Sequence, residues 1–300
     1  MNKYEVEIKL PSESLKFVPH RETMLLVDEL LEYTTGNIKG KTLIKKDNPF
    51  LHDSGIMGRN CLVEIMAQTV AAGNGYNAMV RGDTLKTGFL VGVNDFTFFE
   101  NVRVGDELLV LTNEDSTFGD FTMVQGNISR GKELIARGNL KLYEIAGAPV
   151  KPEGTPSEAP ETNKGSGGPI TPSTNSPFFR AIRESSANFN IHESGAGAEA
   201  DFIFKEDFIG FKGHFPGFPI LPGVVMLETV MALAESLCGK KLKSERITKI
   251  KFSRQCYPGE LLNAQVSMTY ADDLWRINAK LSCGGSPVSS LTALAAPGDF

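Results

Sequence analysis

Hydrophobic and polar positions alternate along ten stretches of the chain, and this period of two is typical of strands with one buried face. In the first half the stretches are 36–46, 89–99, 107–114, 121–129 and 133–143. In the second half they are 196–205, 246–255, 261–270, 274–283 and 288–295. Turn residues such as Gly105-Asp106 and Arg130-Gly131 separate neighbouring stretches. We therefore predict antiparallel sheets.

Two longer segments carry apolar residues at helical spacing instead, and a shorter helix is indicated at 178–184. The first helix begins near Asn60 and the second runs from Gly223 to about Cys238. Both are mostly apolar, so we expect each to lie inside a core. Each also carries a carboxylate among apolar neighbours, Glu64 and Glu228. A carboxylate buried in this way must be partnered, neutral or functional.

The two halves repeat each other. Glu64 matches Glu228 at an offset of 164, whereas Gly105-Asp106 matches Gly259-Glu260 at 154, so the first unit has ten extra residues between helix and sheet. Between the units the chain is rich in Pro, Gly, Ser, Thr and Glu and cannot bury enough apolar surface to offset its ordering entropy. We predict a first unit at 1–146, a flexible linker at 147–176 and a second unit at 177–300.

Composition excludes some classes of protein. The net charge of −5 argues against a general nucleic-acid binder. The most apolar stretch, 220–238, is interrupted by Pro222, Glu228 and Glu235, so no membrane span is expected. The four cysteines lack metal-binding spacing, and the charged start is unlike a signal peptide. We expect reduced thiols and a cytoplasmic protein.

A histidine lies in a loop that proline and glycine make stiff, Phe211-Lys-Gly-His-Phe-Pro-Gly-Phe-Pro-Ile-Leu-Pro-Gly223. Pro222-Gly223 fixes where the following helix starts. The first N–H groups of that helix, at Gly223 and Val224, have no intrahelical acceptor and could hold a developing oxyanion. A base (His214), an anion hole and an acid (Glu228) thus occur within fifteen residues.

This loop and helix resemble the signature of the 3-hydroxyacyl-acyl carrier protein dehydratases of fatty acid synthesis, which have the hot-dog fold. The matching residues are Gly213-His-Phe-Pro216, Pro219-Ile220, Pro222-Gly-Val224 and Glu228, which follows the histidine by fourteen positions. The resemblance implies an α+β fold, a double hot-dog in which each antiparallel sheet wraps around a long central helix.

The first unit resembles the same family but departs from it in one loop. Glu64-Ile-Met-Ala-Gln68 is similar to the family's central helix, and Val18-Pro-His-Arg to its opening segment, where the resemblance implies a packing and hydrogen-bonding role for His20. Fourteen positions before Glu64 stands Phe50, and His52 is twelve positions away. Pro49-Phe50-Leu51, Gly55, 87–92 and 118–121 resemble the dehydratase-like partner proteins of aryl polyene and flexirubin pathways, whose histidine motif has eroded.

In the family that the sequence resembles, the active site lies between two subunits. Carried over, this pairs His214 of the second unit with Glu64 of the first, in a pseudo-dimer made by one chain; a higher oligomer stays open. The reciprocal pair, Glu228 with His52, is expected to be impaired. The chemistry requires no cofactor or metal, and no phosphate-binding loop or zinc spacing is present in the sequence.

The resemblance implies dehydration of 3-hydroxyacyl thioesters on acyl carrier protein to trans-2-enoyl thioesters. Two alternatives stay open: a hot-dog thioesterase, and a catalytic unit joined to a non-catalytic scaffold or acyl-binding unit. A basic run could attract the acidic carrier protein or could be a solvated strand face. It consists of Lys240, Lys241, Lys243, Arg246, Lys249, Lys251 and Arg254.

Four aromatic residues could line an acyl tunnel or pack in the core. They are Phe89, Phe211, Phe215 and Phe218.

Overall fold

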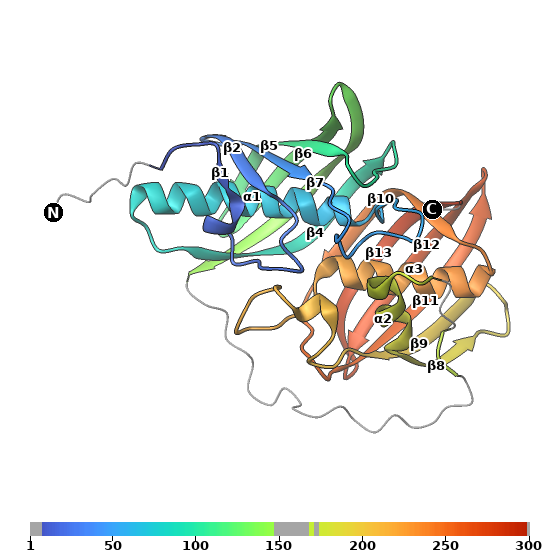
Figure 1. Ribbon diagram of the computed structural model, residues 1–300. Coiled ribbons are helices and arrows are strands. Elements are labelled where there is room, and N and C mark those ends of the chain that lie inside the picture. Colours follow the sequence, from blue (N-terminus) through green and yellow to red (C-terminus); the bar gives the residue numbers. More distant parts are fainter. Residues whose placement is uncertain (1–7, 147–167, 171–173, 299–300) are drawn as a thin grey trace.

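In the computed structural model, which describes residues 8–146, 168–170 and 174–298, each half of the chain forms an antiparallel sheet wrapped around one long helix (Figure 1). The predicted α+β double hot-dog is confirmed. No helix in the described part of the chain has the length and apolar character needed to cross a membrane.

The first unit contains α1 (Cys61–Arg81), the 3-10 helix η1 (Ser14–Lys16) and seven strands. Its strands are β1 (Ser12–Glu13), β2 (Glu29–Thr34), β3 (Asn37–Leu43), β4 (Lys86–Phe98), β5 (Glu107–Phe118), β6 (Phe121–Arg130) and β7 (Glu133–Ala146). The sequence pattern located all of these strands except β1 and β2. In β2 the pattern Glu-Leu-Leu-Glu-Tyr-Thr does not alternate cleanly, and the strand forms by pairing with β3.

The second unit contains α2 (Pro177–Glu184), α3 (Gly223–Cys238), the 3-10 helix η2 (Ile209–Phe211) and six strands. Its strands are β8 (Ser186–Ile191), β9 (Gly197–Ile203), β10 (Leu242–Phe252), β11 (Leu261–Ala271), β12 (Leu274–Cys283) and β13 (Ser286–Pro297). Helix α3 begins after Pro222, as predicted, and ends where Gly239 adopts a left-handed conformation with φ of 66°.

The strands of both units join in one sheet, with the order β1-β2-β3-β5-β6-β7-β4-β10-β13-β12-β11-β9-β8 in the described residues. The junction is the antiparallel pair β4 and β10, in which Ile247 lies opposite Phe96 and Ile250 opposite Val93. All four of these side chains are buried. The two central helices also contact each other. One continuous sheet and a shared core therefore hold the two units in a fixed relation.

The end of the predicted linker is part of the fold. Ile170 is buried, and its backbone N–H donates to Ser186 Oγ at 2.8 Å. Ser176 Oγ donates to the Leu51 carbonyl oxygen, in the first unit, at 2.6 Å. Residues 168–170 and 174–176 of the predicted linker therefore contact the folded units through one apolar side chain and a few hydrogen bonds. The rest of the predicted linker, 147–167 and 171–173, lies outside the described residues.

Candidate active site

His214 is buried in the loop before α3, with 6% of its surface exposed. Its Nδ1 lies 2.9 Å from the Ile220 carbonyl oxygen. Because a carbonyl can only accept, Nδ1 carries the proton and Nε2 keeps its lone pair. Burial lowers the pKa of His214 to about 4, although the Ile220 hydrogen bond acts in the opposite direction. His214 is thus a neutral imidazole with one free basic nitrogen at neutral pH.

Glu64 lies in the first turn of α1 and is also 6% exposed. Burial raises the pKa of its carboxyl group, although the hydrogen bond from Gln68 opposes the shift. Gln68 Nε2 donates to Glu64 Oε1 at 2.8 Å and to the Met24 carbonyl oxygen at 2.7 Å. Gln68 Oε1 accepts from the Leu26 N–H at 2.8 Å. These bonds fix the carboxyl group in place while desolvation favours its protonated form.

The structure brings His214 and Glu64 together from opposite units. His20 lies with them: one nitrogen or oxygen atom from each of the three side chains lies within 4.8 Å of the other two. His20 Nε2 is 3.6 Å from Glu64 Oε1. The sequence predicted a structural role for His20, in packing and hydrogen bonding, and did not include it among the candidate site residues. Its neighbours come from a segment remote in sequence, so the pattern around His20 carried no signal of this position.

These three side chains could also serve as metal ligands by their atom types and separation, as could Cys256, Glu260 and Cys283. In the second group the Glu260 carboxylate already forms an ion pair with Arg254, and its Oε2 accepts from the Tyr257 N–H at 2.8 Å. All four cysteines of the chain have free thiols.

The three side chains line one part of a cavity of about 1040 Å³ that extends along α1. Small residues on one face of α1 leave this space open; they are Ala67, Ala71 and Ala78. Strand β4 forms a facing wall with Phe89, Leu90 and Val91. Of the four aromatic residues proposed as tunnel walls, Phe89 and Phe215 line the cavity. Phe211 is instead packed in the core, against Phe208, and Phe218 packs against Tyr257.

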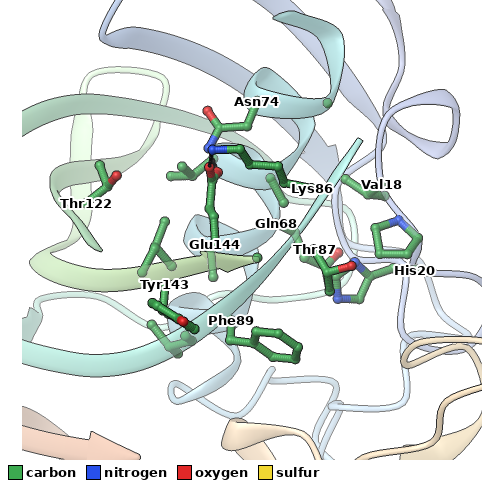
Figure 2. A pocket seen from close by; sticks show the side chains of 18 of the residues that line it. Val18, His20, Gln68, Asn74, Lys86, Thr87, Phe89, Thr122, Tyr143 and Glu144 are labelled. Atoms are coloured by element: carbon green, nitrogen blue, oxygen red, sulfur yellow. Dashed lines mark hydrogen bonds and ion pairs between the residues drawn. The ribbon is translucent and has the colours of Figure 1, made fainter. Parts of the chain in front are cut away.

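The residues that line the cavity differ from one part of it to another. Figure 2 shows His20 and Phe89 in one part and Asn74, Lys86 and Glu144 gathered in another. Asn74 Nδ2 donates to Glu144 Oε1 at 2.7 Å, and Lys86 Nζ lies 3.6 Å from Glu144 Oε2. The space thus connects the imidazole and carboxyl groups to a polar cluster at a distance from them.

Gly223, at the start of α3, also lines the cavity, whereas Val224 is buried in the core. A side chain at position 223 would collide with Phe252, since a Cβ there would lie 2.9 Å from the ring. Glycine thus lets the helix start against this ring while leaving its backbone at the cavity wall. The positive end of the helix dipole is directed there as well.

The reciprocal pair, Glu228 and His52, lines a second cavity of only about 40 Å³. The His52 ring stacks on Phe179 of α2, with 4.2 Å between ring centroids. Asn60 Nδ2 donates to Glu228 Oε1 at 3.0 Å. A Cβ at Gly58 would lie 2.8 Å from the Phe179 ring, so little space remains between α2 and the first unit. Phe179 thus lies between His52 and the loop around Gly58 and leaves only a small cavity beside Glu228.

Burial also shifts the titration of these two groups. It raises the pKa of Glu228 to about 7, which the Asn60 hydrogen bond partly opposes. Burial, with the charge of Lys241, lowers the pKa of His52 to about 4.

Comparisons with known proteins agree with this architecture. A family model of ApeP dehydratases matches residues 13–150, and one of ApeI dehydratases matches residues 190–285. The chain is 42% identical over 66 residues to the 3-hydroxyacyl-[acyl-carrier-protein] dehydratase FabZ of Alkaliphilus metalliredigens, covering 20% of this chain and 45% of that protein. It is 31% identical over 137 residues to FabZ of Syntrophomonas wolfei, covering 44% of this chain and 85% of that protein.

A solved structure from Lactobacillus plantarum, described as an oleoyl thioesterase, superposes with a TM-score of 0.59 and 7% identity. The match covers 88% of this chain and 97% of that one, and it shows the shared fold alone. The FabZ match, which covers 85% of that protein, and the two consecutive family matches identify the family. The chain belongs to the hot-dog 3-hydroxyacyl-[acyl-carrier-protein] dehydratase family, as an ApeP-like dehydratase domain followed by an ApeI-like dehydratase domain.

Proposed function

We propose that this protein is a hydro-lyase that converts 3-hydroxyacyl thioesters on acyl carrier protein to trans-2-enoyl thioesters, in aryl polyene or related acyl chain biosynthesis. One observation carries the proposal: His214 and Glu64 approach each other from opposite units at a cavity of about 1040 Å³. The apolar lining from α1 and from Phe89, Leu90 and Val91 of β4 supports an arrangement in which the acyl chain extends from these two residues along α1.

The proposed reaction uses each group in the state that its surroundings favour. Neutral His214 takes the C2 proton on Nε2, and the electron pair of that C–H bond forms the C2=C3 double bond. The C3–O bond breaks, and protonated Glu64 supplies the proton that completes the leaving water. The start of α3 stabilises negative charge on the thioester oxygen during this step. The residues themselves supply the acid and the base, so this route needs no metal.

One site per chain is proposed to be competent. The second site has a carboxyl group and a histidine, but Phe179 and Asn60 fill the space between the units there. Since the large cavity lies along α1, the first unit contributes acyl binding and the acid rather than serving only as a scaffold. The second unit contributes the base and its loop.

Incubation of the purified protein with a 3-hydroxyacyl carrier protein, followed by mass measurement, tests the activity. Loss of one water supports a dehydratase, whereas release of the acyl group would support the thioesterase alternative. His214→Ala and Glu64→Ala are each expected to lower kcat by about 100-fold or more, because each removes one proton-transferring group. Glu228→Ala and His52→Ala are the matched controls for the reciprocal site. A large loss with Glu228→Ala but not with Glu64→Ala would overturn the composite assignment.

The basic run supports a docking surface for the acidic carrier protein. Lys243, Arg246 and Arg254 form ion pairs with Glu245, Asp95 and Glu260. Lys249 and Lys251 are exposed on β10, which leads directly into the cavity-lining residues 252–255. Free thiols in all four cysteines fit the cytoplasmic location that we propose for this chemistry.

Charge reversal at Lys249 and Lys251 tests the docking surface. The double variant Lys249→Glu/Lys251→Glu should raise KM for the carrier-protein substrate and leave KM for the corresponding pantetheine thioester unchanged. Lys240→Glu/Lys241→Glu makes the same charge change just before β10, at the opposite end of this strand. Equal effects of the two double variants would contradict a docking role for Lys249 and Lys251.

A further inference from the structure

The polar cluster formed by Asn74, Lys86 and Glu144 joins opposite walls of the large cavity. All three residues line the cavity, Asn74 from α1, Glu144 from β7 and Lys86 from β4. Asn74 Nδ2 donates to Glu144 Oε1 at 2.7 Å, and Lys86 Nζ lies 3.6 Å from Glu144 Oε2. Figure 2 shows the Asn74 and Glu144 side chains extended toward each other. The cluster therefore divides the cavity into a part near Glu64 and a part farther along α1.

The near part of the cavity has apolar walls. Ala67 and Ala71 form one wall, and Leu90 and Leu142 lie on the facing strands. Position 74 follows Glu64 by ten residues on the same helix. At the helical rise this is about 15 Å, the length of an extended hydrocarbon chain of about twelve carbons. The near part thus suits an acyl chain of limited length that starts at the reacting carbons.

The far part of the cavity is polar. Arg81, Asp83, Glu114 and Thr117 line it. Arg81 Nε lies 3.3 Å from Asp83 Oδ2, and the two side chains are 67% and 44% exposed, so solvent reaches this part. A hydrocarbon chain gains binding free energy by moving from water to apolar surface. Extension of the chain into the far part therefore adds little to its binding.

Passage between Asn74 and Glu144 is also unfavourable. The distance of 2.7 Å between Nδ2 and Oε1 leaves no room for a methylene group, so a longer chain must break this hydrogen bond. The Glu144 carboxylate would then face hydrocarbon in place of a donor, which is costly for a charged group. The Glu144 side chain is only 23% exposed, so water can compensate only in part.

We propose that the polar cluster sets the length of the hydrocarbon chain that the site accepts, at about twelve carbons beyond C3. This inference rests on the proposed function and makes Asn74 and Glu144 specificity-determining residues of that site. They touch neither the base nor the acid. They act on the far end of the acyl chain, and so on the preference between substrates that undergo the same reaction.

Two substrates that differ only in chain length test this role, the carrier-protein thioesters of 3-hydroxydodecanoate and 3-hydroxyoctadecanoate. The unmodified protein should dehydrate the shorter one with a kcat/KM at least about tenfold higher. Asn74→Leu replaces the amide with an apolar side chain of similar size and removes the hydrogen bond. It should lower the ratio of the two kcat/KM values by about fivefold or more. Glu144→Leu should do the same from the opposite wall, whereas Glu144→Gln keeps an acceptor for Asn74 and should keep the ratio.

Asn77→Leu is the matched control, because Asn77 lines the same cavity on α1 but is not part of the polar cluster. It should leave the ratio unchanged. Equal kcat/KM values for the two chain lengths in the unmodified protein would overturn the inference, and so would a ratio that Asn74→Leu and Glu144→Leu do not change. Absence of dehydration of either substrate would count against the proposed function instead. Binding of dodecanoyl and octadecanoyl carrier proteins to the same variants would then still decide whether the cluster selects chain length.

Discussion

At the scale of single residues, burial shifts the pKa values of the proposed base, His214, and the proposed acid, Glu64, in opposite directions. It lowers the pKa of His214 to about 4 and raises that of Glu64. In water, a histidine and a glutamate would both be charged between their ordinary values of 6.5 and 4.5. These opposite pKa shifts favour the uncharged form of each group, which the proposed proton transfers require.

The first prediction concerns the pH dependence of catalysis. Protonation inactivates His214 only near its lowered pKa, so kcat/KM should rise with pH around pH 4 and have no step at 6.5. At higher pH, ionisation of Glu64 should lower the rate above the raised pKa of that group. Steady-state rates across pH, with each sample re-measured at neutral pH to exclude unfolding, test this. An acidic limb near 6.5 would contradict a desolvated His214.

The second prediction concerns Glu228, whose pKa is raised from 4.5 to about 7 by burial. The folded protein binds this proton more tightly than the unfolded chain. The resulting stability is therefore complete below about 4.5 and is lost as pH rises to about 7. The two pKa values correspond to roughly 3 kcal/mol lost above pH 7.

Glu228→Gln removes this ionisation and keeps an oxygen that can accept from Asn60 Nδ2. The variant should be more stable than the parent at pH 8, by up to roughly 3 kcal/mol, and similar to it at pH 4. Urea unfolding at both pH values measures the difference. Glu193→Gln, at an exposed position, is the control. A gain in stability of equal size at both pH values would argue against a titration effect.

At the scale of elements, the loop before α3 fits against the segment before β2. Gly213 has a φ of 79°, and a Cβ there would lie 2.1 Å from the Arg21 carbonyl oxygen. Gly217, in the same loop, has a φ of 81° but no atom within 4 Å of a Cβ. Both positions favour glycine by conformation, but only Gly213 is also restricted by contact with the other unit.

This pair gives the third prediction. Gly217→Ala should destabilise the protein by about 1 kcal/mol from backbone strain and leave kcat nearly unchanged. Gly213→Ala should cost at least about 1–3 kcal/mol more, because backbone atoms of the two units must separate. It should also lower kcat by displacing His214. Urea unfolding and steady-state kinetics of the two variants are the measurements. Similar kcat values for both would show that the contact does not position the base.

At the scale of the whole molecule, one chain joins two unlike hot-dog units. The β4–β10 pair makes the sheet continuous, and the shared core fixes α1 relative to α3 (Figure 1). The two potential sites differ greatly in space, about 1040 Å³ against 40 Å³. The two unlike units thus leave a large cavity on one side of their contact and a small one on the other.

The fourth prediction distinguishes a site within one chain from a site between chains. Glu64→Ala retains His214, and His214→Ala retains Glu64, so chains that exchanged site residues would complement each other. With a site inside each chain, the two variants should show no activity above their separate values, whether mixed or co-expressed with different tags. The unmodified protein mixed with either variant serves as the positive control. Recovery of activity in the doubly tagged fraction would place the site between chains.

The sequence by itself determined the elements and most of the candidate site. Periods of two and of 3.6 residues located most strands and both long helices, since these periods record which face is buried. Pro222-Gly223 located the start of α3, because proline excludes the preceding helical geometry. The two glutamates could be identified because they are ionisable residues in mostly apolar helices. The histidine could be identified because it lies in a loop rich in proline and glycine.

Tertiary structure decided what depends on distant contacts. The short strands β2 and β8 form by pairing with neighbours, and the residues around Ile170 are anchored by the second unit. The place of His20 beside Glu64 depends on the Arg21–Gly213 contact between units, and the small volume of the second cavity depends on Phe179 of α2. Local sequence records which face of an element is buried, but not which remote atoms cover it.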